Sequence, residues 1–227
     1  MNGSNKKTKA PKPSPGRSVS HTLLPIKLSK PSLKSRVPLS KVLQQRKTIR
    51  EISEKNLPPQ IISNLLWAAC GINRKKGPFG IPGRTAGSAS NSQEVELYVA
   101  IESGIYLYDI SHHWLVPVIS GDFRSLAIGQ GQPNFPAKAP IHLIYVADIN
   151  KLANTSGYQE PGLQDPEVQE SYYYVDTGLI AGNVYLFAAS EGLATWFHNC
   201  NRHALNAILN LHPEQRVLFG QTVGYPA

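Results

Sequence analysis

The feature that most constrains the fold is a segment of small and apolar residues between Ser171 and Glu191, which we expect to form the longest helix. Its apolar and small positions recur at helical spacing, at Val175, Leu179, Gly182, Leu186 and Ala189. The glycines and alanines of this segment let a second helix or a strand approach closely. A helix that is apolar nearly all round has to be covered on most sides. We therefore expect this segment in the core or at a subunit interface.

Shorter patterns predict the elements around this helix. Further helices are expected from Pro38 onward, over 60–70 and over 202–209, with a short one beginning near 121. Strands are expected over 95–101, 105–108, 114–119, 141–146, 193–197 and 217–223, with a polar surface excursion over 150–170. The continuous apolar run of 141–146 is typical of a central strand. This order predicts an α+β fold with a mostly antiparallel sheet flanked by helices.

The net positive charge of the chain comes from its beginning. The first 50 residues contain 13 of the 23 Lys and Arg and no acidic residue, so all 15 Asp and Glu lie in the remainder. Lysine, proline and serine dominate residues 1–35, which predicts a disordered basic leader before one domain over 36–227. Such a leader can touch nucleic acid or an anionic membrane. Because this segment has little to bury, we expect a solvated leader and neither of these partners.

Length and cysteine content set the class of protein. The 227 residues are enough for one domain with a substantial core. No apolar run reaches the roughly 18 residues of a transmembrane helix, and no apolar region follows the basic N-terminus as in a secretory signal. Cys70 and Cys200 are the only cysteines. This excludes a disulfide scaffold or a Cys-rich zinc module and indicates a reducing, cytoplasmic compartment.

Arg46, Thr48 and Arg50 alternate along the chain. In an extended segment these three side chains share one face, while Lys47 and Ile49 lie on the other. Two guanidinium groups and a hydroxyl on one face can bind a phosphate monoester. An ordinary basic turn after a helix remains the alternative.

A small, polar loop precedes the strand expected at 95–101. Its residues are Ser88, Ala89, Ser90, Asn91, Ser92 and Gln93. Small residues let the backbone approach a flat ligand, and amide side chains both donate and accept at the edge of a heteroaromatic ring. The preceding segment 71–87 has a length typical of a functional or a disordered loop. A surface turn is the alternative for the loop taken alone.

Several catalytic motifs are absent from the sequence. There is no P-loop and no serine nucleophile elbow, and the glycines near Gly129 do not complete a dinucleotide fingerprint. His112 and His113 are adjacent and would point apart on a strand, and no set of carboxylates or cysteines completes a metal site. No side chain is a clear general base, so we expect neither a catalytic residue nor a metal. An enzyme built from these parts would take its chemistry from a cofactor.

Four segments occur in a characteristic order over residues 39–226. They are RKTIR at 46–50, LLWAACGINR at 65–74, GRTAGSASNSQ at 83–93 and AGNVYLFAASEGLAT at 181–195. The sequence VGYP follows at 223–226. Each segment alone is a weak signal, but the ordered set resembles the FMN-dependent nitroreductase-like oxidoreductases.

This resemblance implies a nitroreductase-like fold and an intertwined homodimer with two FMN sites at the subunit interface. The phosphate and ribityl end of FMN would be bound by Arg46, Thr48 and Arg50. The flavin edge would be reached from the partner subunit by Ser88, Ala89, Asn91 and Gln93. The donors near flavin N5 would be backbone amides around His198 and Asn199.

The resemblance also implies a ping-pong oxidoreductase with a small-molecule acceptor. NADH or NADPH would give hydride to FMN, and a nitroaromatic, a quinone or a similar acceptor would then take its place. The acceptor pocket would be shaped by Tyr172, Tyr173 and Trp196, with core packing as the alternative for each. A flavin enzyme that oxidises azoline rings or other small or peptide substrates is the second interpretation. A non-enzymatic binder acting through the basic tail is the third.

Three positions depart from the family pattern. Gly87 replaces a usual proline, and Gly182 and Ala194 replace a glutamine and a glycine. Many relatives also carry a Lys or Arg after the GYP segment, whereas this chain ends at Ala227. One phosphate contact is therefore expected to be missing or supplied elsewhere.

Overall fold

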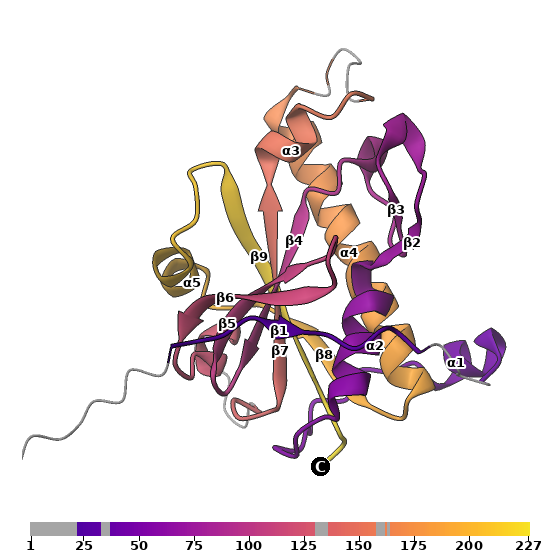
Figure 1. Cartoon of the computed structure of the whole chain (residues 1–227), viewed down its shortest axis with the longest axis vertical. Helices are drawn as coiled ribbons and strands as arrows, with labels where there is room; N and C mark the ends of the chain where they lie inside the picture. Colours follow the sequence, from indigo (N-terminus) through magenta and orange to yellow (C-terminus); the bar gives the residue numbers. More distant parts are fainter. Residues whose placement is uncertain (1–21, 33–36, 130–135, 158–161, 163) are drawn as a thin grey trace, which may run out of the picture.

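A seven-stranded antiparallel sheet forms the centre of the molecule (Figure 1). The computed structural model describes residues 22–32, 37–129, 136–157, 162 and 164–227. In spatial order the strands are β1 (Ile26–Lys27), β6 (Trp114–Ser120), β5 (Gly104–Asp109), β4 (Val95–Ile101), β7 (Ile141–Asp148), β9 (Gln215–Gly224) and β8 (Ala194–His198). The apolar strand β7 lies between β4 and β9, as its composition predicted.

Helices cover both faces of this sheet (Figure 1). On one face, α2 (Pro59–Cys70) and α4 (Pro166–Ser190) pack against each other over the larger apolar core. On the other face, α5 (Arg202–Leu209) covers a smaller core. The remaining helices are α1 (Leu39–Gln45), which packs on α4, and α3 (Ile149–Ala153), which follows β7. The predicted α+β fold with an antiparallel sheet flanked by helices is confirmed.

Helix α4 begins five residues earlier than expected, at Pro166. Asp165 caps it by accepting a hydrogen bond from Glu167 N at 2.8 Å, and proline fits the first helical position because it needs no donor there. One stripe of the helix faces outward, since Val175 is 59% and Leu179 47% exposed. Side chains added at Gly178 and Gly182 would also meet open space. Within one chain, α4 therefore leaves a stripe at Val175, Gly178, Leu179 and Gly182 uncovered.

The segment 22–32 corrects the expected leader, whose boundary at residue 35 is too late. β1 pairs with the edge strand β6, and Leu28 N donates to His113 O at 3.2 Å. The segment is then tied to α2, because Ser32 N donates to Asn64 Oδ1 at 2.8 Å and Asn64 Nδ2 donates to Ser32 O at 2.9 Å. The rest of the predicted leader, 1–21 and 33–35, lies outside the described residues.

The long loop at 71–87 contains regular structure that its glycines and prolines did not suggest. Two short strands, β2 (Ile72–Arg74) and β3 (Gly83–Arg84), pair into an antiparallel ribbon. Short 3-10 helices occur at Pro78–Gly80, Ala89–Asn91 and Arg124–Ala127. Among the described residues, no helix is both long and apolar enough to cross a membrane.

Candidate functional site

The segment that contains Arg46, Thr48 and Arg50 runs beside the edge strand β8. Ile49 N donates to Thr195 O at 3.1 Å, and Ile49 packs into a small cluster with Ala194. Because Ile49 points inward, the flanking polar side chains are left facing outward. The alternation read from the sequence thus corresponds to an extended segment with one apolar contact.

Thr48, Arg46 and Arg50 meet aromatic side chains from α4 and β8. The Thr48 hydroxyl lies 3.0 Å from the Tyr185 hydroxyl, which also accepts a hydrogen bond from Phe197 N at 3.0 Å. The Arg46 guanidinium lies 5.5 Å from the centre of the Tyr185 ring. The Arg50 guanidinium lies 4.9 Å from the centre of the Trp196 ring. Contacts of this kind orient a guanidinium without using up its N–H donors.

The residues around β8 fit a phosphate group. Arg46 and Arg50 are both exposed, and within the described ranges neither forms an ion pair with a carboxylate. Their donors are therefore available to an anion, and a guanidinium fork matches phosphate oxygens. Thr48 lies between them in the chain as a third polar contact. This arrangement favours the phosphate interpretation over an ordinary basic turn.

The loop 88–93 adopts a backbone that amino acids with side chains rarely adopt. The φ angles are positive at Ser90 (49°), Asn91 (58°) and Gln93 (56°). Gln93 Nε2 donates to Pro82 O at 2.6 Å and to Asn91 Oδ1 at 2.9 Å, and Gln93 N donates to Ser88 Oγ at 3.0 Å. In the single chain, the two amide side chains therefore hold the loop together, a use that the sequence did not suggest.

A buried pair of carboxyl groups lies behind this loop. Asp176 Oδ2 accepts a hydrogen bond from Ala89 N at 2.8 Å, and Ser92 Oγ donates to Glu94 Oε2 at 2.5 Å. Both acids are buried. Burial and then the nearby charge of Glu94 raise the pKa of Asp176 to about 7. Arg84 lies beside the pair, and burial lowers its pKa.

His198 is buried between β8 and β9. Its Nδ1 lies 2.8 Å from Asn199 O, and its Nε2 lies 2.8 Å from Thr222 Oγ1. Burial lowers the pKa of His198 to about 4. The neighbouring Asn199 is exposed. The side chain of His198 is thus part of the sheet packing, whereas the neighbouring residue Asn199 is accessible to a ligand.

The three residues predicted to shape the acceptor pocket lie in different surroundings. Tyr172 is on the outer side of α4, whereas Tyr173 is buried in the larger core with its ring 5.0 Å from Tyr174. Trp196 is partly buried, with its ring 5.3 Å from that of His198. Burial favours core packing, the alternative interpretation, for Tyr173. Trp196 alone lies beside the arginine segment.

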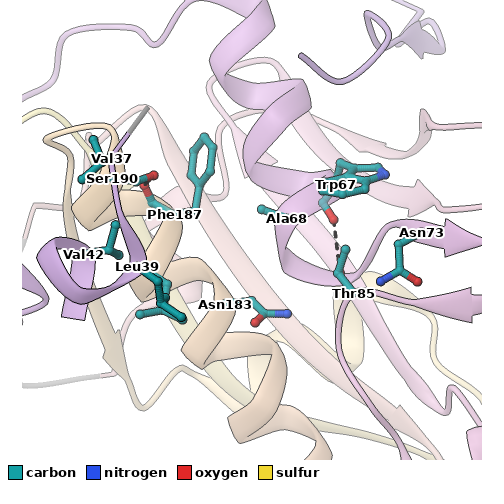
Figure 2. Close-up of a pocket in the computed structure, with 11 residues that line it drawn as sticks. Val37, Leu39, Val42, Trp67, Ala68, Asn73, Thr85, Asn183, Phe187 and Ser190 are labelled. Carbon is teal, nitrogen blue, oxygen red and sulfur yellow. Dashed lines mark hydrogen bonds between the residues drawn. The ribbon is translucent and has the colours of Figure 1, made fainter. Parts of the chain in front are cut away.

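An open cavity of about 410 Å³ lies between α1, α2 and α4 (Figure 2). Its lining comes from Val37, Leu39, Val42, Trp67, Ala68, Asn73, Thr85, Asn183, Leu186, Phe187 and Ser190. At one side Thr85 Oγ1 donates to Trp67 O at 3.2 Å, and Asn183 Nδ2 donates to Ala69 O at 3.3 Å. The cavity combines apolar walls with a few polar groups, a composition typical of a binding or subunit-contact surface.

Comparison with known proteins decides the family. A sequence model described as "Nitroreductase family" matches residues 43–225. The chain belongs to this family. A protein of Methanocaldococcus jannaschii described as a nitroreductase is 30% identical over 166 residues, which cover 70% of this chain and 77% of that protein. The family and fold indicate an oxidoreductase of the flavin type.

Solved structures agree with the family assignment. A protein of Ralstonia eutropha described as a nitroreductase has a TM-score of 0.76 and 32% identity, covering 97% of this chain and 96% of that chain. A chain of an Escherichia coli microcin synthetase complex, solved with a truncated microcin precursor, has a TM-score of 0.61 and 18% identity, covering 90% and 78%. At this low identity, the similarity to the microcin synthetase chain concerns the fold alone.

Within one chain of this nitroreductase-family protein, the two halves of the predicted cofactor site are separate. Asp176, which contacts the loop 88–93, and Tyr185, which contacts Thr48, are nine residues apart on α4. At 1.5 Å per residue this is about 13 Å along the helix. The structure therefore brings Arg46, Thr48, Arg50 and Trp196 together, and leaves Ser88, Ala89, Asn91 and Gln93 as a second cluster.

Other polar groups of this nitroreductase-family chain have structural partners. His112 Nδ1 lies 2.7 Å from Asp109 Oδ2, and His113 lies 2.7 Å from the Tyr108 hydroxyl. In the part of the chain that the structure describes, no three His, Cys, Asp or Glu side chains gather as metal ligands. Burial raises the pKa of both Cys70 and Cys200 to about 11, so neither thiol is an activated nucleophile.

The sequence analysis did not identify two residues of the site. Tyr185 connects Thr48 to β8, and Asp176 anchors the loop at Ala89. The signal for Asp176 was present, because a carboxyl group stood within a segment expected to be buried. Such a group needs a hydrogen-bond partner. Tyr185 gave no comparable signal, since an aromatic residue fits a core helix without any special role.

Proposed function

We propose that the chain is an FMN-dependent oxidoreductase that takes hydride from NADH or NADPH and reduces small acceptors such as nitroaromatics or quinones by a ping-pong mechanism. The observation that carries the proposal is the pair of exposed guanidinium groups of Arg46 and Arg50. Arg46 lies on the ring of Tyr185 in α4, and Arg50 lies on the ring of Trp196 in β8. Thr48, between the two arginines in the chain, contacts the Tyr185 hydroxyl. A phosphate-terminated ligand is the natural occupant of such a site.

The proposed functional unit is a homodimer. The outward stripe of α4 supports this, since Val175 and Leu179 are exposed there and two glycines leave room for close approach. Exposed apolar patches often mark a contact with another protein surface. A second copy would also bring its loop 88–93 to the arginine segment of the first. The separation of the two clusters within one chain then has a simple explanation.

Each part of the chain has a binding or positioning task in this proposal. Bound FMN supplies the hydride-accepting ring. Arg46, Thr48 and Arg50 hold its phosphate, and the backbone near Asn199 faces its reactive edge. Trp196 closes one side of the site and excludes water. No side chain is required as an acid or base.

The phosphate assignment is tested by the double substitution Arg46→Ala with Arg50→Ala. Hydrogen bonds between charged partners contribute about 1.5–3 kcal/mol each, so we expect FMN affinity to fall by more than about a hundredfold. Lys47→Ala is the matched control, because Lys47 lies in the same segment on the other face. The measurement is the flavin absorbance that remains after gel filtration. A double variant that keeps its full flavin content would overturn the assignment.

The electron donor and the compartment are part of the same proposal. Bleaching of the visible flavin spectrum by NADH or by NADPH, followed by its recovery on addition of menadione or nitrofurazone, tests the ping-pong sequence. Both cysteines are free and buried, which fits a reducing location such as the cytoplasm.

A further inference from the structure

We propose that His198 is a positioning residue that orients the Asn199–Cys200 peptide group and thereby tunes the reduction potential of the flavin. This inference rests on the proposed function and deepens it. It assigns a task to a buried side chain that does not itself touch the cofactor. The task is set by hydrogen bonds on both sides of the imidazole ring.

The hydrogen bonds fix the tautomer of His198. A carbonyl oxygen can only accept, so Nδ1 must carry the proton that is donated to Asn199 O at 2.8 Å. Nε2 must then accept from the Thr222 hydroxyl, also at 2.8 Å. Thr222 Oγ1 also lies 2.9 Å from His142 Nδ1. The hydroxyl of Thr222 therefore donates to His198, and His198 donates to the Asn199 carbonyl.

Packing holds the ring of His198 in place. His198 lies opposite Gly220 in the pairing of β8 with β9. A Cβ atom at Gly220 would approach His198 Cε1 to 2.7 Å and Nδ1 to 3.2 Å, so only glycine leaves room for the ring. The ring of Trp196 contacts it at 5.3 Å between centroids. The imidazole thus has one position and one donor atom.

His198 and His142 both stay neutral near physiological pH. Burial is the main cause in each case, and it lowers the pKa of His198 to about 4 and that of His142 to about 3. The same pattern of donors is therefore kept throughout the neutral range. The orientation of the peptide group is a fixed property of the site and does not switch with pH.

The direction of the peptide carbonyl determines the direction of its N–H. In a planar trans peptide the two groups point to opposite sides. Since Asn199 O is turned toward the buried His198 ring, Cys200 N–H is directed away from it. In the proposed function, backbone N–H groups of this stretch face flavin N5. Such a donor matches the oxidised ring, whose N5 accepts, better than the reduced ring, whose N5 carries hydrogen. Fixing this peptide therefore favours oxidised FMN and lowers the reduction potential.

The test compares three variants of the full chain. His198→Leu removes the donor, and His198→Asn restores it because Asn Nδ2 can occupy the place of Nδ1. His203→Leu makes the same change at an exposed histidine of α5. The measurements are the midpoint potential of bound FMN and the dissociation constant of oxidised FMN. For His198→Leu we expect oxidised FMN to bind about tenfold more weakly relative to reduced FMN, a rise of about 30 mV in potential.

The other two variants separate a positioning role from a structural one. His198→Asn should recover most of the wild-type potential, and His203→Leu should match wild type. If His198→Leu does not fold, Thr222→Val against Thr222→Ser decides instead, because only valine removes the hydroxyl that holds Nε2. Unchanged potentials in His198→Leu, or in Thr222→Val where that pair is used, overturn the inference while the proposed function stands. Wild-type protein that takes up no FMN ends both.

Discussion

Asp176 and Ala89 are joined by a hydrogen bond of 2.8 Å from the backbone N–H of Ala89 to the buried carboxylate oxygen Oδ2 of Asp176. Through this contact, helix α4 holds the polar loop 88–93 from behind. Three residues of the loop have positive φ, a conformation that costs energy and persists only where the surroundings impose it. A side chain in the middle of a helix thus sets the shape of a loop 87 positions earlier in the sequence.

The buried pair of Asp176 and Glu94 predicts a pH dependence of stability. The pKa of Asp176 is raised in the folded protein, so protonated Asp176 stabilises the fold. This contribution to the free energy of unfolding is fully present below the pKa of the unfolded chain, near 4, and is lost as pH rises through about 7. Asp176→Asn cannot ionise, so it avoids this fall in stability, and its side-chain oxygen still accepts from Ala89 N. We expect the variant to be more stable than wild type at pH 8, by about 1–3 kcal/mol.

The measurement is denaturant unfolding at pH 5 and pH 8. The wild-type free energy of unfolding should fall between these values, whereas that of Asp176→Asn should change less. Glu170→Gln neutralises an exposed acid on the same helix and is the control. Parallel pH profiles for wild type and Asp176→Asn would contradict the raised pKa.

Removal of the Tyr185 hydroxyl should lower the affinity for flavin and leave the fold intact. Its hydroxyl connects Thr48 Oγ1 with Phe197 N, each at 3.0 Å. Tyr185→Phe keeps the ring under Arg46 and removes only this hydroxyl. A neutral hydrogen bond is worth about 0.5–1.5 kcal/mol, so we expect FMN to bind roughly 2- to 12-fold more weakly. Tyr174→Phe, which keeps the ring contact with Phe219, is the control, and equal affinities for the two variants would exclude this role.

The outward stripe of α4 predicts where the subunits of the proposed homodimer meet. Leu179→Glu places a charge at a position that is 47% exposed in the single chain, so it should leave the fold of one chain intact. In a dimer through this face the charge would be buried, which is strongly unfavourable. We expect sedimentation to show a monomer that has lost its flavin. Val118→Glu, at a similarly exposed position on β6, should remain a dimer; a dimeric Leu179→Glu protein would rule out this interface.

Local patterns were sufficient for most of the fold. The apolar runs at 95–101 and 141–146 became β4 and β7 with starts as expected, and α5 has the predicted bounds. The predictions were weaker where long-range contacts decide the structure. β1 has two residues and exists because β6 offers an open edge, and the ribbon β2–β3 forms within a segment that reads as a loop.

The candidate site divides in the same way. The alternation of Arg46, Thr48 and Arg50 was visible because an extended segment has a period of two. The partners of His198 were not, since Thr222 and His142 are distant in sequence and meet only through the sheet. The same holds for Asp176 and Ala89. Spacing within a segment can be read from sequence, but contacts across strands depend on the register of the whole sheet.

The segment 22–32 predicts that the basic N-terminal region has two separable parts. Ser63 Oγ donates to Ser29 O at 2.5 Å, Asn64 exchanges two hydrogen bonds with Ser32, and Leu28 N donates to His113 O. These contacts lie between the edge strand β6 and helix α2. Deletion of 1–21 leaves all of them in place, whereas deletion of 1–32 exposes the buried polar groups of Ser63 and Asn64.

We therefore expect the shorter deletion to keep the wild-type unfolding temperature and NAD(P)H oxidation. The longer deletion should lower the free energy of unfolding by about 2–4 kcal/mol, because several hydrogen bonds and one strand pairing are lost. Ser32→Pro in the full chain removes the Ser32 N donor alone and should give a smaller loss of about 1 kcal/mol. If the deletion of 1–21 abolished oxidation, the basic residues would have a direct role and the chain would act through its tail.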